Sequence, residues 1–217
     1  MRMRKKRNLV PRMEACSDIW IRQPEQLRGH WRELFPQARE VHLEVGCGKG
    51  KFTVETAAAE PDILLLAMER VPEAMVMAME KAKAAGLKNV FFIGEDVARL
   101  GDLFAPGELD RIYINFCDPW PHKKHAPRRL THAGFLALYR EALGPGKEIH
   151  FKTDNAGLFD FSLEQFASCG FALKEITQDL HRDGPVGIMT GYEEKFYAAG
   201  TPICRLVAVC QEVKNGE

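Results

Sequence analysis

The sequence lacks the features of a membrane-spanning or metal-binding protein. Its longest strongly apolar run, residues 63–68, is far too short to cross a bilayer. The six cysteines form no Cys-x-x-Cys pair and show no metal-ligand spacing. No secretory signal is visible either. We therefore expect a cytoplasmic protein without bound metal, whose thiols are reduced and mostly buried.

Net charge is also absent, because 30 basic side chains balance 30 acidic ones. Any affinity for nucleic acid must then come from the distribution of charge. The first twelve residues hold no acid but six basic side chains, namely Arg2, Arg4, Lys5, Lys6, Arg7 and Arg12. Such a block at a terminus is usually a disordered tail and sometimes an arm that binds nucleic acid.

The pattern that is present is that of an α/β protein. A chain of 217 residues, 46% of them hydrophobic, is long enough for one sizeable domain. Seven predicted strands cover residues 41–45, 63–68, 89–93, 110–116, 147–152, 170–177 and 203–209. Helical patterns separate most of them, which is typical of a doubly wound sheet. We expect the domain to occupy residues 41–217, after a basic N-terminal arm and an irregular or partly helical lead-in over residues 1–40.

A glycine-rich turn, residues 46–50, follows the first predicted strand and precedes a helical pattern. Gly46 and Gly48 permit a tight turn and the close approach of a ligand to the backbone. The spacing is G-x-G-x-G rather than the dinucleotide-binding G-x-G-x-x-G. The second strand ends in Glu69, which is placed either to accept hydrogen bonds from both hydroxyls of a ribose or to begin the next helix.

Carboxylates mark the ends of the predicted strands. They are Glu44, Glu69, Asp96, Asp118 and Asp154. The carboxyl edge of a parallel sheet binds ligands, so this pattern favours a hydroxyl-rich, amine-bearing or cationic ligand. S-adenosylmethionine has all three properties, whereas NAD would favour an anion cradle at its pyrophosphate. Asp96 is placed to accept from the amino group of an adenine, or else to cap the following helix.

The fourth predicted strand runs into a rigid corner, Asp118-Pro119-Trp120-Pro121, and then into a basic segment. Each proline fixes its own φ and restricts the residue before it, so Asp118 and Trp120 lie on stiff backbone. A carboxylate and an aromatic ring beside phosphate-seeking cations suit a site that handles a nucleic-acid base. The alternative is an ordinary turn with a solvated basic face. We expect Trp120 to pack against the fold rather than to stack on a base.

A helix start is predicted near the C-terminus. Thr190 is followed three residues later by Glu193, which is the spacing of a capping box. In this motif each side chain accepts a hydrogen bond from the backbone N–H of the other residue. We therefore expect a helix that begins at about residue 190.

Taken together, these motifs resemble the bacterial tRNA (guanine-N7)-methyltransferases. The resemblance rests on the glycine turn at residues 43–50, Glu69, the corner at 118–121, Phe151-Lys152-Thr153-Asp154 and the Thr190-x-Tyr192-Glu193 segment, in one register from about residue 40 to 209. It implies a Rossmann-like methyltransferase fold whose last strand is antiparallel. It also implies transfer of a methyl group from S-adenosylmethionine to N7 of a guanine in the variable loop of tRNA, at position 46.

The resemblance also implies roles for individual residues. The cofactor would be bound by Glu44, Gly46, Gly48, Glu69, Asp96 and Asp118, and Asp118 would also be catalytic. The substrate would be contacted by His122, Asp154, Thr190, Tyr192 and Glu193. The RNA would be bound by Lys123, Lys124, Arg128 and Arg129. The resemblance also favours RNA binding by the basic N-terminal arm. The protein would be a monomer or a homodimer.

The chain departs from the family pattern around the basic segment. Members commonly carry Pro in place of Cys117, Lys in place of His122 and basic residues in place of Ala126 and Pro127, so this strip is thinner than usual. Three other interpretations stay open: a different methyl acceptor, an NAD-linked oxidoreductase, and a non-catalytic RNA-binding protein. Guanine N7 has an in-plane lone pair and no proton to remove. We therefore expect Asp118 to hold the base and offset the developing positive charge rather than to act as a general base.

Overall fold

The computed structural model of the protein describes residues 7–212, and its centre is one eight-stranded sheet. The order is β1-β4-β3-β2-β5-β6-β8-β7. The strands are β1 (Trp20–Ile21), β2 (Glu40–Val45), β3 (Ile63–Met68), β4 (Val90–Ile93), β5 (Arg111–Asn115), β6 (Glu148–Thr153), β7 (Phe171–Thr177) and β8 (Cys204–Cys210). The pairings from β1 to β6 are parallel, whereas β8 is antiparallel to both β6 and β7. The predicted α/β sheet with an antiparallel last strand is confirmed, with one strand more than the seven expected.

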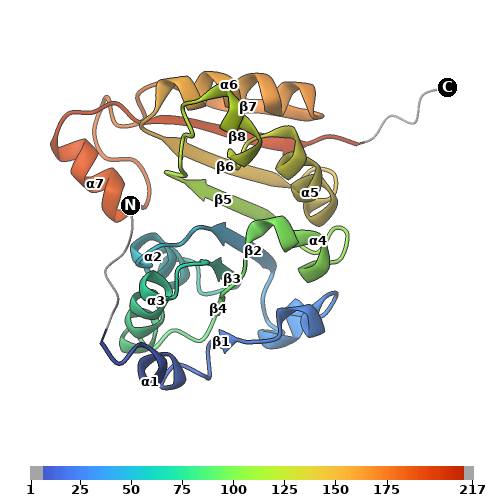
Figure 1. The fold of residues 1–217 in the computed structure, drawn as a ribbon, viewed down its shortest axis with the longest axis vertical. Coiled ribbons are helices and arrows are strands. Elements are labelled where there is room, and N and C mark those ends of the chain that lie inside the picture. Colours follow the sequence, from blue (N-terminus) through green and yellow to red (C-terminus); the bar gives the residue numbers. More distant parts are fainter. Residues whose placement is uncertain (1–6, 213–217) are drawn as a thin grey trace.

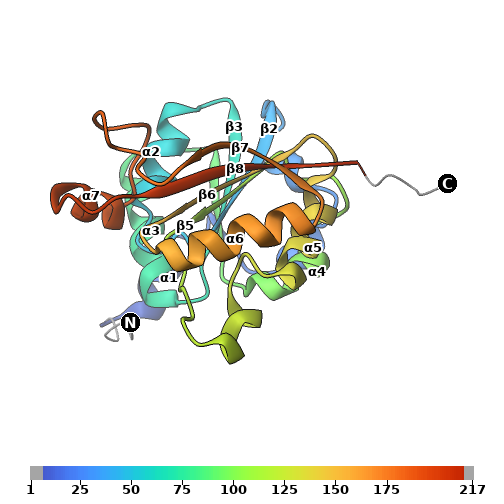
Figure 2. The ribbon, with the colours of Figure 1, turned by 90° about the horizontal axis from the view of Figure 1, so that it is seen from above.

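Helices cover both faces of this sheet (Figure 1). The α-helices are α1 (Leu9–Glu14), α2 (Lys51–Ala59), α3 (Pro72–Ala84), α4 (Leu100–Leu103), α5 (Ala133–Leu143), α6 (Ala156–Ser168) and α7 (Gly191–Ala198). Short 3₁₀ helices are η1 (Pro24–Leu27), η2 (Trp31–Leu34), η3 (Val97–Arg99) and η4 (Lys123–Arg128). One apolar cluster joins α4, α5 and α6 to the sheet and another joins α1, α2 and α3 to it. Figure 2 shows α4, α5 and α6 on one side of the sheet and α2 on the other.

The two halves of the sheet differ in how their strands are buried. Every residue of β3, Ile-Leu-Leu-Leu-Ala-Met, is buried, as expected for a strand covered on both faces. By contrast, β5 alternates polar Arg111, Tyr113 and Asn115 with apolar Ile112 and Ile114. This period of two places the polar set on the face of the sheet opposite α5 and α6. The sheet is therefore fully sandwiched at β3 and carries polar side chains on one face at β5 and β6.

The lead-in is folded onto the sheet from residue 7 onward. Trp20 and Ile21 form β1, which pairs in parallel with β4 at the sheet edge. We predicted no strand here, because two residues are too short to show a period. Trp31 is fully buried, its indole N–H donates to the carbonyl of Leu103 at 2.9 Å, and its ring stacks on Phe104. The local sequence around Trp31 gave no sign of this interaction, because Leu103 is 72 residues away in the chain.

The cysteines and the basic N-terminal residues can also be compared with what the sequence predicts. All six cysteines are free and four of them are buried, which agrees with reduced, mostly buried thiols. Of the basic N-terminal residues, Arg2, Arg4, Lys5 and Lys6 lie outside the described part of the chain. Arg12 lies within it and makes a two-pronged ion pair with Glu80 of α3, with both N···O distances at 2.6 Å.

The last glycine of the glycine-rich turn is required by the packing of α2 against α3. Gly50 has a φ of 71°, in the left-handed region that side chains rarely adopt. A Cβ atom at this position would lie 2.4 Å from the Cβ of Ala78 in α3 and 2.7 Å from its Cα. Glycine therefore satisfies two constraints, the backbone conformation and the close approach of the helix.

We predict that Gly50→Ala destabilises the protein more than Gly86→Ala does. Gly86 has a similar φ of 68°, but nothing lies within 4 Å of the position of its Cβ. Gly86→Ala should therefore cost only the conformational strain, about 1–2 kcal/mol, and Gly50→Ala about 1–3 kcal/mol more because α3 must move. Urea denaturation of both variants measures the difference. Equal losses would contradict the close approach of α2 and α3.

Candidate functional site

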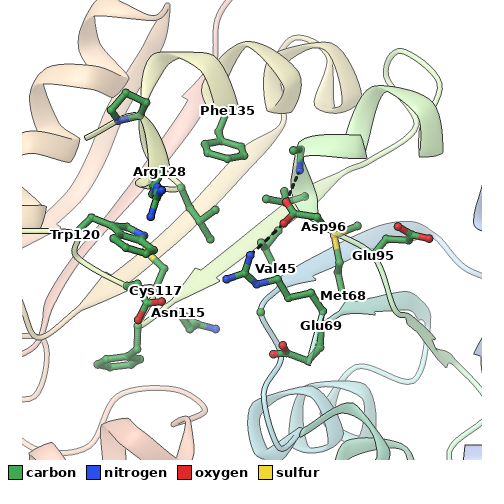
Figure 3. A pocket seen from close by; sticks show the side chains of 18 residues that line it. Val45, Met68, Glu69, Glu95, Asp96, Asn115, Cys117, Trp120, Arg128 and Phe135 are labelled. Carbon is green, nitrogen blue, oxygen red and sulfur yellow. Dashed lines mark hydrogen bonds and ion pairs between the residues drawn. The ribbon is translucent and has the colours of Figure 1, made fainter. Parts of the chain in front are cut away.

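A cavity of about 560 Å³ opens at the carboxyl ends of β2, β3, β4 and β5. The strand order reverses between β2 and β5, and this switch point is where open α/β sheets bind ligands. A residue within three positions of the end of each strand supplies part of the wall: Gly46 after β2, Glu69 after β3, Asp96 after β4 and Asp118 after β5. In Figure 3, Glu69 and Asp96 face Trp120 and Arg128 across the cavity.

The carboxylate of Glu69 is oriented by the backbone around it. Its Oε2 accepts from the N–H of Gly48 at 3.0 Å and its Oε1 accepts from the N–H of Val71 at 2.9 Å. Gly46 is exposed, has a φ of 77°, and has nothing within 4 Å of the position of its Cβ. The glycine turn thus fixes the acid through Gly48 and leaves the backbone open to a ligand at Gly46. This combination suits a bound ribose.

Asp96 caps a helix and also lines the cavity, so the two roles proposed from the sequence are compatible. Its Oδ1 accepts from the N–H of Ala98 at 3.0 Å at the start of η3, which confirms the cap. Its Oδ2 lies 3.3 Å from a guanidinium nitrogen of Arg70. Both carboxylate oxygens therefore have partners, and the side chain keeps one orientation at the cavity wall.

The corner that holds Asp118 has strained backbone. Phe116 has a φ of 54° and Trp120 a φ of 41°, both unusual for residues other than glycine. The Asp118 carboxylate lines the cavity, is exposed, and has no hydrogen-bond partner among residues 7–212. Both oxygens of this predicted catalytic carboxylate can therefore accept hydrogen bonds from a ligand.

Arg129 braces this corner from behind. Its guanidinium donates to the carbonyl of Pro119 at 3.1 Å and to that of Trp120 at 3.0 Å. The same group lies 4.4 Å from the ring centroid of Phe161. We expected Arg129 to bind RNA, and the structure shows that two of its guanidinium nitrogens, Nε and Nη2, donate to the protein backbone. Its neighbours Lys123, Lys124 and Arg128 are exposed, as an RNA-binding role requires.

Trp120 forms part of the cavity wall. Its ring is half-buried, with the guanidinium of Arg128 5.0 Å from the centroid and the ring of His125 edge-on at 5.7 Å. We expected it to pack against the fold, and it does so through these two basic side chains rather than through the apolar core. The basic segment and the cavity therefore adjoin at Trp120.

Glu44 lies behind the cavity rather than in its wall. It is 2% exposed, and its Oε2 accepts from the hydroxyl of Thr53 at 2.5 Å. Burial raises the pKa of Glu44 to about 7, and the hydrogen bond from Thr53 opposes that shift. We expected Glu44 to contact the cofactor directly. The structure instead places it beneath the glycine turn, because it is the next-to-last residue of β2 and its side chain points into the sheet face that α2 covers.

The predicted substrate-binding residues lie outside the cavity wall. His122, Asp154 and Tyr192 are exposed. Thr190 and Glu193 form the predicted capping box, which confirms the helix start at α7. The Glu193 carboxylate is fully buried, and it is bound there by Lys152 at 2.6 Å and by His181 at 3.0 Å. Both oxygens of the Glu193 carboxylate therefore bind other residues of the protein.

The cavity wall also includes residues that sequence analysis did not predict. Among them are Arg70, Glu95, Asn115 and Phe135. The side-chain amide of Asn115 is buried and makes no hydrogen bond of standard geometry among the described residues, although it lies close enough to Glu44 to lower the pKa of that carboxyl. The position of Asn115, a polar residue at the C-terminal end of β5, could have indicated its place in the cavity wall from the sequence. Phe135 gave none, because it resembles any other apolar residue of a helix.

Within residues 7–212, no group of three or more His, Cys, Asp or Glu side chains is arranged to hold a metal ion. In the same part of the chain, no helix is both long enough and apolar enough to cross a bilayer.

The fold and the site together define a Rossmann-like methyltransferase domain, with a glycine turn after β2, an acid at the tip of β3 and an antiparallel last strand. Residues 38–206 match a family model described as "Putative methyltransferase". The sequence is 45% identical over 206 residues to a tRNA (guanine-N(7)-)-methyltransferase of Bacillus velezensis, covering 94% of this chain and 95% of that protein. It is 43% identical over 210 residues to one of Geobacillus kaustophilus, covering 96% and 97%. The chain belongs to the tRNA (guanine-N(7)-)-methyltransferase family.

Solved structures agree at the level of the fold. A 16S rRNA (adenine(1408)-N(1))-methyltransferase from Catenulisporales acidiphilia, determined with its cosubstrate SAM, superimposes with a TM-score of 0.64. The superposition covers 89% of this chain and 94% of that one, at 14% identity. The 16S rRNA methyltransferase KamB gives a TM-score of 0.63 at 16% identity, covering 85% and 94%. At these identities the likeness establishes the fold alone.

We predict that Arg129→Ala destabilises the protein, whereas Lys124→Ala does not. The first substitution removes hydrogen bonds to two backbone carbonyls and should lower the free energy of unfolding by about 1–3 kcal/mol. Lys124 is exposed, so its loss should change that quantity by less than about 0.5 kcal/mol. Thermal and urea unfolding measure both. If the two variants were equally stable, the hydrogen bonds of Arg129 to the corner would not contribute to the stability of the protein.

We also predict that Glu44 makes stability depend on pH. Its pKa is raised from 4.5 to about 7 on folding, so the folded state binds a proton more tightly than the unfolded state. The associated stability is fully present below pH 4.5 and is lost as the pH rises to about 7. Relative to Glu44→Gln, the wild type should lose about 3 kcal/mol over this window. Urea titrations at several pH values measure the difference between the two proteins, and parallel curves would contradict the shift.

Proposed function

We propose that the protein transfers a methyl group from S-adenosylmethionine to N7 of a guanine in the variable loop of tRNA, at position 46. The observation that carries the proposal is the convergence of three carboxylates, Glu69, Asp96 and Asp118, on one cavity at the switch point of the sheet. The membership of the chain in the tRNA (guanine-N(7)-)-methyltransferase family supplies the reaction. A tRNA substrate also agrees with a cytoplasmic location.

The residues of the cavity fit S-adenosylmethionine, which supplies an electrophilic methyl group on a positively charged sulfur. Four acids and two arginines line the wall, so the balance of charge favours a cation. Glu69, oriented by two backbone N–H groups, would accept hydrogen bonds from the ribose hydroxyls. Asp96 would accept from the adenine amino group, and the amide of Asn115 would complete the polar contacts.

Asp118 would act on the guanine rather than on the cofactor alone. Guanine N7 attacks with an in-plane lone pair, so no base has to remove a proton. Methylation leaves positive charge on the purine, and a fixed carboxylate at its N–H edge would stabilise that charge as it develops. The strained corner and the Arg129 brace would hold the carboxylate in place before the reaction, which makes positioning the main contribution of the protein.

The RNA would approach over η4. Lys123, Lys124 and Arg128 are exposed on this segment, and Arg128 is also part of the cavity wall. Contacts from these cations to phosphates would give an affinity that falls as salt rises. The basic residues before residue 7 would act as a further nucleic-acid arm in a chain with no net charge.

The proposal predicts where methyl groups will be found. Wild-type protein, labelled S-adenosylmethionine and an unmodified tRNA transcript should give labelled RNA. Borohydride reduction and aniline cleavage should then cut it once, in the variable loop. Asp118→Ala should lower turnover by about 10²-fold or more, while Asp102→Ala, which removes an exposed acid of α4, should leave it unchanged.

Three results would contradict the proposal in different ways. Label without a cut would keep a methyltransferase but discard N7 as the target atom. A cut elsewhere in the tRNA would discard the variable loop. No label on any tRNA, together with tight tRNA binding, would indicate an RNA-binding protein without this activity. Full turnover of Asp118→Ala at saturating substrate would remove Asp118 from the mechanism.

A further inference from the structure

No apolar side chain of helix α7 is fully buried, and Phe196 is half-buried. Of its eight residues, Gly191–Ala198, the single buried one is Glu193. A helix this short is not stable in isolation. The loop before it, with Val186, Gly187 and Ile188, borders a second cavity of about 330 Å³, so apolar packing beneath that loop is incomplete. The position of α7 therefore depends on a few specific contacts.

The strongest of these contacts is a buried group of three ionisable side chains. The Glu193 carboxylate is bound by the ammonium of Lys152 at 2.6 Å and by a ring nitrogen of His181 at 3.0 Å. The three side chains are 0%, 10% and 3% exposed. Lys152 also donates to the carbonyl of Ile188 at 3.1 Å, and so ties the preceding loop to β6. Removing one partner from such a group leaves an uncompensated buried charge.

A second contact connects α7 to the strained corner. The ring of Phe196 stacks on that of Phe116, with centroids 5.9 Å apart and planes 24° from parallel. Phe116 carries one of the positive φ angles and lies two residues before Asp118. Lys51, at the start of α2, reaches α7 as well through an ion pair with Glu194 at 3.1 Å. Helix α7 thus contacts both the glycine-turn side and the Asp118 side of the cavity.

We propose that Lys152 and His181 are positioning residues. They hold Glu193 and thereby dock α7, and Phe196 of the docked helix supports Phe116 in the conformation that places Asp118 in the cavity. This inference rests on the proposed function for its kinetic readout, but the docking itself is measurable without any RNA. It gives Glu193 a structural role in place of the substrate contact expected from the sequence.

The test compares Lys152→Met with Lys152→Arg, and uses Lys195→Met as a matched control on the exposed face of α7. In Lys152→Met, backbone amides of residues 191–198 should exchange hydrogen faster. Turnover of tRNA at saturating substrate should fall by about tenfold to 10²-fold because Asp118 is misplaced. The dissociation constant for S-adenosylmethionine should stay close to that of the wild type. Lys152→Arg should restore much of the turnover, and Lys195→Met should match the wild type in all three measurements.

A second variant separates the docking of α7 from the effect of docking on turnover. Phe196→Leu removes the ring stack but leaves the Lys152–Glu193 ion pair, so α7 should remain protected from exchange while turnover falls. The proposal is overturned if Lys152→Met keeps wild-type exchange and turnover, or if it loses cofactor binding in step with global unfolding. If Lys152→Met does not fold, wild-type turnover in Phe196→Leu overturns it. A wild type that methylates no tRNA would defeat the proposed function, and amide exchange would still decide the docking.

Discussion

Strained backbone on either side of Asp118 is the feature on which the site depends. Phe116 and Trp120 both have positive φ angles, which are stable only where the surroundings over-determine them. Arg129 supports the corner from one side through the carbonyls of Pro119 and Trp120. Helix α7 contacts it from the other through the stacked ring on Phe116. The backbone that carries the exposed Asp118 carboxylate is in this way fixed from both sides, although the carboxylate itself has no hydrogen-bond partner among residues 7–212.

The chain has no net charge, but two adjoining surfaces carry charge of opposite sign. The cavity wall is mainly acidic, with Glu69 and Asp96 held by backbone N–H groups that keep their oxygens in place. The η4 segment beside it is basic and exposed. Trp120 and Arg128 lie where the two surfaces meet. An acidic cavity for a cationic donor next to a basic surface for RNA brings the two proposed substrates together without a net charge on the protein.

The uneven burial of the sheet explains how a charged side chain can organise a helix. At β3 both faces are apolar and covered, and α2 and α3 pack on one of them through apolar side chains. At β5 and β6 one face is polar, so the segments above it are held by ion pairs and hydrogen bonds. Lys152 belongs to this polar set, and α7 is docked through it. Specific polar contacts therefore do on this half of the sheet what hydrophobic burial does on the other half.

Local spacing in the sequence determined most of the elements: the seven longer strands, the glycine turn, the capping box at Thr190 and the acids at the strand tips. These features depend on residues near one another in the chain, so periodicity and motif spacing reveal them. Only the tertiary structure decided what each side chain contacts. It buried Glu44 behind the cavity, directed Arg129 at the backbone of the corner, enclosed Glu193 between Lys152 and His181, and added β1 to the sheet edge. The partners in these contacts are mostly distant in sequence, and no local pattern records which of them will meet.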